Sequence, residues 1–275
     1  MAAGRAAWPA ALVLAAGCAS TLGTRGEPTG KEGYLGLEVC PVKDGLLAGR
    51  VVTGSPADKA GIHGGDVLTG SNGQDLVDPE RRRAFLSGVR GGAGGAMSVT
   101  LTRHGLARSV EATPRWKERY AEDDLAAALT DEIVSGRKVA VAAIIARVSH
   151  ARPETFKNAL ALGAWESATR ASLRKAAEGL LLGKRFSRCS NFSVVDREST
   201  ARAVGELRLQ ASEALAPETA KQLGKLTGAS HLLFVTMTRS SKGADSYEDD
   251  IHAAVFSAET GASLVAVGFR RSVSR

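Results

Sequence analysis

The stretch from Ser55 to Leu68, with the sequence SPADKAGIHGGDVL, limits the possible folds of this chain more than any other segment. Ser55 is a typical helix N-cap, and Pro56 fits the first turn of a helix, where no backbone N–H donor is needed. Gly61 ends this short helix, and the pair Gly64–Gly65 turns the chain before an apolar strand. A phosphate-binding loop would need Lys and Ser or Thr directly after the glycines, and this stretch has neither. The glycine pair is therefore interpreted as a turn between closely spaced elements.

The surrounding segment, residues 32–114, has the size of a small folded domain. We expect strands at 49–53, 66–68 and 97–105 and a helix at about 79–89, in which Phe85, Leu86 and Val89 share one side. An Asn-Gly turn lies within Ser71–Gln74.

The order of the motifs YLGL, SPADKAGI, GGDVL and NGQ, followed by a helix and VTLTR, resembles that of bacterial PDZ domains. The resemblance covers roughly eighty residues. It implies a module that binds the C-terminus or an extended strand of a partner protein as an added β-strand.

The resemblance also implies which residues bind the peptide. The terminal carboxylate would lie on the backbone N–H groups of Leu35, Gly36 and Leu37. Because Pro41 has no N–H group, we expect strand pairing to stop there, after about four partner residues. The expected peptide-binding residues are Tyr34, Leu35, Gly36, Leu37, Val39, Phe85 and Val89.

Two alternatives bear on this groove. Arg81 and Arg82 near the start of the helix could favour acidic residues in the partner, or they could form a solvated helix face. The groove itself could also be filled by the chain's own residues, in which case it would bind no partner.

The N-terminus has the pattern of an export signal. The apolar run from Ala6 to Ala16 is too short to span a bilayer and fits a secretory signal. It ends in LAAGC, which resembles the lipobox of bacterial lipoproteins and implies cleavage before Cys18 and lipidation of its sulfur. We interpret 1–17 as a lipoprotein signal peptide and 18–31 as a flexible tether, with the anchor in the outer membrane facing the periplasm. The alternative is an ordinary cleaved signal beside a chance cysteine.

Residues 125–272 form a second unit after a charged connector at 115–124. Apolar strand-like runs alternate with amphipathic helical segments, which indicates a mixed-sheet α/β sandwich. With the small PDZ β-sandwich and its helices in front, the chain as a whole is expected to be of the α+β or α/β class.

Three blocks of the second unit carry a further resemblance: FSVVDRESTARAVGELRLQ, LGKLTGASHLLFVTMT and IHAAVFSAETGASLVAV. They resemble the curli-secretion (CsgG/FlgO/LpoB-type) superfamily, which includes envelope lipoproteins and activators of peptidoglycan synthases. Secretion channels of this kind carry membrane-spanning hairpins of about ten alternating residues per strand. No such pair is evident between Lys138 and Arg202. We therefore expect a periplasmic protein-binding adaptor or assembly factor, which could form a homo-oligomer; the alternative is an oligomeric secretion channel component.

Patterns typical of an enzyme are missing from the sequence. The five histidines lack HExxH or Cys–His metal spacing, and there is no GDSGG or GxSxG element. Asp196 and Glu198 fit a helix cap better than a catalytic carboxylate pair. The net charge of +7 comes with only one short arginine run, which does not predict nucleic-acid binding. We expect no catalytic residue, metal or cofactor, and no nucleic-acid partner.

Cys40 and Cys189 could form a disulfide in an oxidising periplasm. Because the two cysteines fall in different units, we expect two separate thiols instead.

Overall fold

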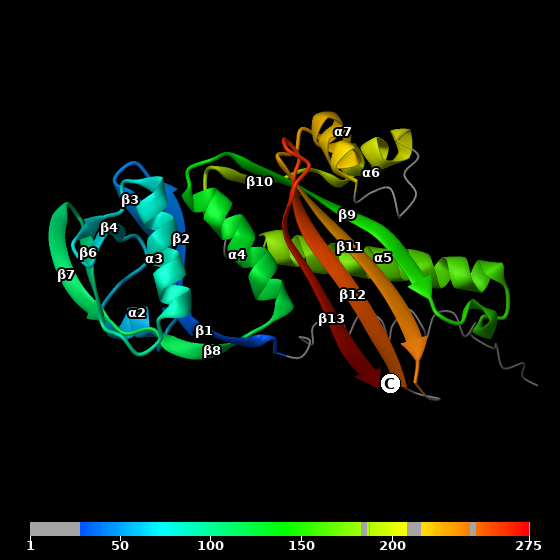
Figure 1. Ribbon diagram of the computed structural model, residues 1–275, viewed down its shortest axis with the longest axis horizontal. Helices are drawn as coiled ribbons and strands as arrows, with labels where there is room; N and C mark the ends of the chain where they lie inside the picture. Colours follow the sequence, from blue (N-terminus) through cyan, green and yellow to red (C-terminus); the bar gives the residue numbers. More distant parts are fainter. Residues whose placement is uncertain (1–27, 183–185, 187, 208–215, 243–245, 275) are drawn as a thin grey trace, which may run out of the picture.

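The computed structural model describes residues 28–182, 186, 188–207, 216–242 and 246–274. Two units lie side by side, and helix α4 (Ala121–Val134) stands between them (Figure 1). The class is mixed α and β, as expected from the sequence.

The N-terminal unit is built on a six-stranded antiparallel sheet and a separate two-stranded ribbon. The main sheet has the order β2 (Leu37–Val42), β3 (Gly45–Val51), β4 (Val67–Ser71), β6 (Met97–Arg103) and β7 (Leu106–Ala112), with β5 (Gln74–Asp75) paired to β4. The ribbon pairs β1 (Gly30–Tyr34) with β8 (Arg115–Arg119). Helices α2 (Pro56–Lys59) and α3 (Pro79–Gly91) complete the unit.

The segment from Ser55 to Leu68 folds as its sequence indicates. The Ser55 side chain caps α2 by accepting a hydrogen bond from the N–H of Asp58, and Gly61 takes φ +80° directly after the helix. Asp66 is buried, and Arg103 bonds both of its carboxylate oxygens at 2.7 and 2.8 Å. Burial alone would raise the pKa of Asp66, but these bonds outweigh it and hold the pKa below its ordinary value.

The C-terminal unit is a five-stranded mixed sheet with helices on both faces. Its strand order is β10 (Phe192–Val194), β9 (Val139–His150), β11 (His231–Ser241), β12 (Ser246–Ser257) and β13 (Ser263–Ser274). Strand β9 is parallel to both of its neighbours, whereas β12 is antiparallel to β11 and β13.

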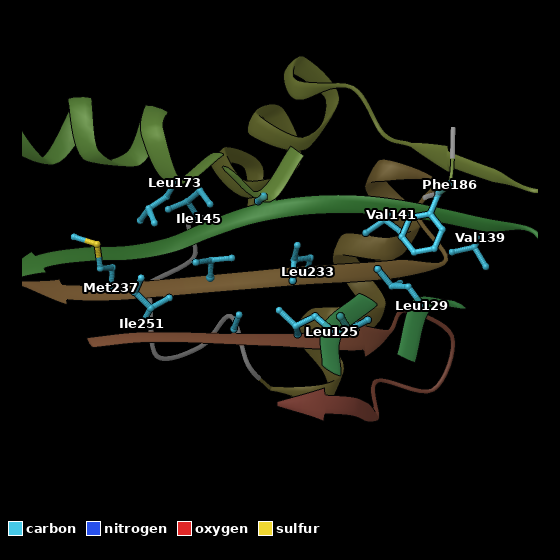
Figure 2. Packing of buried hydrophobic residues seen from close by; sticks show 14 of the residues in the cluster. Leu125, Leu129, Val139, Val141, Ile145, Leu173, Phe186, Leu233, Met237 and Ile251 are labelled. Atoms are coloured by element: carbon cyan, nitrogen blue, oxygen red, sulfur yellow. The ribbon is translucent and has the colours of Figure 1, made fainter. Parts of the chain in front are cut away.

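Helix α4 and the long helix α5 (Ala159–Leu182), which follows the short 3-10 turn η1 (Pro153–Thr155), pack on one face of this sheet. Leu125, Leu129 and Leu173 meet the strands there (Figure 2). Helices α6 (Arg197–Glu206) and α7 (Pro217–Thr227) contribute to a second cluster on the opposite face.

The segment expected to be a charged connector, 115–124, consists mainly of regular secondary structure. Residues 115–119 form strand β8, and α4 begins at Ala121. Val134 of α4 belongs to the N-terminal core, whereas Leu129 and Ile133 belong to the C-terminal core. Strand β1 likewise begins at Gly30, inside the segment interpreted as a tether. The helix is therefore shared by the two cores.

The expectation of two separate thiols is wrong, because Cys40 and Cys189 form a disulfide. The residues are 149 positions apart, but the chain returns after α5 to the edge of β2 and brings their Cα atoms to 5.1 Å. Arg188 adds a hydrogen bond to the carbonyl of Gly49 at the same junction, and Arg90 of α3 binds Asp131 of α4 through two bonds of 2.9 and 3.0 Å.

Within the described part of the chain, every helix is too short or too polar to cross a membrane.

Candidate functional site

A groove of about 360 Å³ lies between β2 and α3. All seven residues expected to bind a peptide line this β2–α3 groove: Tyr34, Leu35, Gly36, Leu37, Val39, Phe85 and Val89. The structure therefore brings together the set that the sequence selected.

The loop at the start of β2 points backbone N–H groups away from the core of the unit. The carbonyl of Leu35 accepts a hydrogen bond from Ala57 N–H, and the carbonyl of Gly36 accepts one from Val52 N–H, both at 2.9 Å. In a trans peptide the carbonyl and the following N–H point in opposite directions. The N–H groups of Gly36 and Leu37 therefore point away from these bonds, toward the groove.

Gly36 is required by the shape of this loop. Its φ is +80°, a conformation that side chains rarely adopt, and a Cβ atom at this position would overlap the side chain of Ser55. The glycine lets the loop close tightly on the cap of α2.

Strand β2 is the edge of its sheet, with β3 as its neighbour. A register shift places the extra residue Gly49 on β3, so β2 itself keeps its alternation. The Gly36 carbonyl points toward β3, and the main-chain groups of Leu37 and Val39 therefore point outward. Pro41 lies in the same outward row, where its missing N–H removes no bond to β3.

Apolar side chains form the floor of the groove. Leu35, Val39, Phe85 and Val89 are buried in the N-terminal core, while Leu37 is half-buried above them. An apolar pocket beside outward-pointing N–H groups suits a ligand that ends in an apolar residue with a free carboxylate.

One wall of the groove comes from the C-terminal unit. Asp123, Ala127 and Thr130 of α4 line it, together with Phe186. Cys189 Sγ also lies 3.8 Å from the carbonyl oxygen of Val39. Since this sulfur is in a disulfide and carries no hydrogen, the approach is a contact and not a hydrogen bond. Sequence reasoning missed this wall, and the only available signal was the pair of cysteines.

Among the described residues, three acidic and three basic side chains line the groove. Lys117 binds Glu32 at 2.7 Å and Asp123 at 3.4 Å, and Arg50 binds Glu38 at 3.4 Å. With these charges paired, backbone N–H groups are the main feature here that can hold a carboxylate.

The two arginines considered for the groove make their contacts outside it. Arg82 is buried and donates to the carbonyls of Leu76 at 2.6 Å and Val42 at 2.9 Å, which ties α3 to the end of β2. Burial lowers its pKa. This corrects both interpretations of Arg82, because it is neither solvated nor on the groove surface. Arg81 pairs with Asp75 outside the groove.

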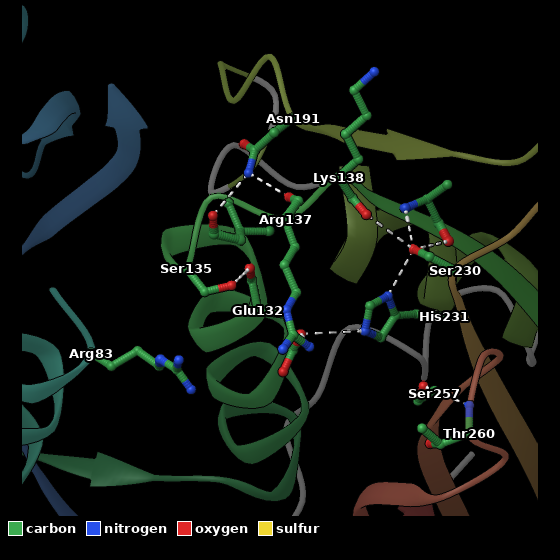
Figure 3. Close-up of polar contacts among 12 residues, drawn as sticks. Arg83, Glu132, Ser135, Arg137, Lys138, Asn191, Ser230, His231, Ser257 and Thr260 are labelled. Carbon is green, nitrogen blue, oxygen red and sulfur yellow. Dashed lines mark hydrogen bonds and ion pairs between the residues drawn. The ribbon is translucent and has the colours of Figure 1, made fainter. Parts of the chain in front are cut away.

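A second polar cluster joins Ser230, His231 and Glu132 (Figure 3). Ser230 Oγ lies 2.9 Å from His231 Nδ1, and His231 Nε2 lies 3.9 Å from Glu132. The order resembles that of a Ser–His–acid triad, which the sequence did not predict. However, Ser230 Oγ also accepts a 2.9 Å bond from Ala140 N–H and lies 3.3 Å from the Lys138 carbonyl.

The histidine of this cluster is buried, and desolvation lowers its pKa even though Glu132 acts in the opposite direction. The cluster therefore links the start of β11 to β9. The hydroxyl of Ser230 already contacts the backbone of Ala140 and Lys138.

The interpretation of Asp196 as a helix cap is confirmed. Its side chain accepts hydrogen bonds from the N–H groups of Glu198 and Ser199, each 2.9 Å long, at the start of α6. The hydrogen bonds from Ser199 hold the pKa of Asp196 below its ordinary value.

Cys18, the expected lipidation site, lies outside the described residues. Among those that are described, no group of three or more His, Cys, Asp or Glu side chains could hold a metal ion.

No family model matches the chain. The chain is 35% identical over 94 residues to a protein of Rhizobium meliloti (strain 1021) described as a probable periplasmic serine endoprotease DegP-like. The match covers 30% of this chain and 18% of that protein, so the chain spans only a small part of this curated relative.

Solved structures are similar to separate parts of the chain. The C-terminal domain of LpoB from Escherichia coli is 12% identical, with a TM-score of 0.31 and coverage of 49% of this chain and 82% of that one. The HtrA3 PDZ domain bound to a phage-derived ligand (FGRWV) is 18% identical, with a TM-score of 0.28 and coverage of 32% and 90%.

Proposed function

We propose that this protein is a lipid-anchored adaptor of the bacterial envelope and that it captures the C-terminus of a partner protein in the β2–α3 groove. The ligand adds to the free edge of β2 as an antiparallel strand, as in PDZ domains. Its carboxylate accepts hydrogen bonds from the N–H groups of Gly36 and Leu37. Its last side chain enters the pocket floored by Leu35, Phe85 and Val89.

One observation carries the proposal: the inward carbonyls of Leu35 and Gly36 turn two N–H groups toward the end of an apolar groove beside an unpaired strand edge. The partial similarity to a periplasmic protein supports an envelope location, as does the lipobox-like sequence before Cys18.

The adaptor is proposed to act by binding, without catalysis. In support, the Ser230 hydroxyl already bonds the backbone of Ala140 and lies 3.3 Å from the Lys138 carbonyl, and its neighbour His231 is buried. A nucleophile needs an accessible face beside its base.

The test is a library of random peptides with free C-termini, screened against the protein without residues 1–18. The best peptide is then compared with its C-terminally amidated form by fluorescence anisotropy. Because a hydrogen bond to a charged group contributes about 1.5–3 kcal/mol, amidation should weaken binding about tenfold or more. Equal affinity for the two forms, or no selected peptide at all, would contradict the proposal. Sizing of the full chain in mild detergent distinguishes an adaptor from an oligomeric secretion channel.

A further inference from the structure

We propose that the C-terminal unit takes part in ligand selection, because its helix α4 and its disulfide close the β2–α3 groove and restrict it to about the last three residues of a ligand. This inference rests on the proposed function of the groove. It adds a specificity determinant that the N-terminal unit does not contain.

The free edge of β2 is short. Outward main-chain groups begin at Gly36 and Leu37, where the carboxylate would bind, and continue at Val39. An added strand lies about 4.8 Å from its neighbour, and its N–H approaches the facing carbonyl to about 2.9 Å. Cys189 Sγ is already 3.8 Å from the Val39 carbonyl. A ligand strand therefore meets the disulfide after about three residues.

Beyond Val39, strand β2 is covered by the C-terminal unit. Cys40 belongs to the hydrophobic core of the C-terminal unit and is 3% exposed, so β2 is packed against that unit where a longer ligand would continue. Pro41 offers no N–H for pairing.

Helix α4 forms one wall of the groove. Ala127 and Thr130 are half-buried, and the Thr130 hydroxyl already donates to the Ala126 carbonyl at 2.6 Å. Phe186 packs on Phe192 with ring centroids 4.9 Å apart and lines the groove. These three side chains are uncharged, and Asp123 on the same wall is paired with Lys117. The groove thus accepts a short apolar C-terminal tail and excludes a long extended segment.

The experiment uses peptides of three, five and eight residues that share the C-terminal tripeptide of the best library peptide. With the oxidised wild-type protein, affinity should change less than about twofold as the peptide lengthens, since no pairing groups are gained. In the Cys40→Ala/Cys189→Ala variant the sulfur beside the Val39 carbonyl is removed, so the five-residue peptide, which can pair with this carbonyl, should bind about fivefold or more tightly than the tripeptide. The eight-residue peptide should gain nothing further, because Pro41 offers no N–H.

A second variant tests the wall without removing the disulfide. Thr130→Trp adds a large side chain to the groove and should weaken tripeptide binding about tenfold or more. Leu160→Trp is the matched control, because Leu160 is 82% exposed on α5 and does not line the groove, so the affinity should remain that of wild type. Melting curves verify that each variant is folded.

Two outcomes overturn the inference: wild-type affinity that rises fivefold with peptide length, or Thr130→Trp binding that equals wild type. In both cases peptides still bind, so the proposed function survives. If no peptide binds wild type, it is the proposed function itself that fails.

Discussion

The sulfur of Cys189 lies 3.8 Å from the carbonyl oxygen of Val39, so a residue from the C-terminal unit touches the edge strand of the N-terminal unit. This contact accompanies the disulfide between Cys189 and Cys40. Cys40 lies on β2 of the N-terminal unit, but its side chain packs in the core of the C-terminal unit. The groove and the junction between the units are therefore parts of one structure, and changes at the junction should be measurable in both stability and binding.

Removal of the disulfide should destabilise the protein. Cys40→Ser/Cys189→Ser opens a loop of 149 residues and should lower the free energy of unfolding by about 2–4 kcal/mol, since the cross-link restricts the unfolded chain. Urea unfolding measures the change. A reducing agent should destabilise the wild type similarly and leave the variant unaffected; an equal response of both proteins would refute the assignment.

The Asp66–Arg103 pair should be the more important of two arginine–aspartate contacts. Arg103→Leu leaves the buried Asp66 without its partner and should cost about 3 kcal/mol. Arg81→Leu, which breaks the exposed pair with Asp75, should cost less than about 1 kcal/mol. Thermal melting of the two variants makes the comparison, and similar losses would argue against a structural role for Asp66.

The same pair predicts a response to acid. The folded-state pKa of Asp66 lies below its unfolded value, so its contribution to stability is complete above about pH 3.9 and is lost as the pH falls through the folded pKa. The melting temperature should therefore fall less steeply below pH 4 in Asp66→Asn than in wild type. Parallel curves would contradict this.

Buried histidines should make the protein less stable in mild acid. Burial is the main cause that lowers the pKa of both His150 and His231. The unfolded chain then binds more protons between the folded pKa and about 6.5, so stability falls as the pH drops through this window. The melting temperature at pH 5 should be lower than at pH 7.5, and His231→Asn should reduce the difference. An unchanged difference would show that His231 does not contribute.

Gly36 should tolerate no side chain. Gly36→Ala combines a positive φ with overlap on Ser55, and it should cost about 2–3 kcal/mol and abolish peptide binding. Gly54 offers a matched control, with φ +73° and no atom near the added methyl group, so Gly54→Ala should cost about 1 kcal/mol and keep binding. Equal effects would mean that the overlap is relieved by movement of the loop.

Lipidation is tested separately from the groove. Cells that express the full chain with radiolabelled palmitate should label the wild-type protein, and Cys18→Ala should remove the label. Labelling that persists in the variant would show that the lipid is attached to a residue other than Cys18.

Local sequence signals predicted the local structure well. The N-cap at Ser55, the helix end at Gly61 and the cap at Asp196 are confirmed because each depends on neighbours a few residues away. The seven groove residues were implied by the resemblance to PDZ domains, and the structure places all of them in the groove. Arg82 was misjudged because a charged residue near a helix start gives no sign that two distant carbonyls will surround it.

These local signals could not predict contacts between residues far apart in the sequence. The pairing of Cys40 with Cys189 depends on how the chain returns after α5, and nothing near either cysteine specifies that path. The wall formed by Ala127 and Thr130 was missed as well, because half-buried small residues on a helix do not reveal which neighbour they face.

Helix α4 gives its last apolar residue, Val134, to one core and its earlier ones to the other. A cut on either side of this helix would leave one fragment with a missing piece of its interior. Heating should consequently melt the described body in a single cooperative step. Cleavage by a protease near residue 120 should not release two folded halves.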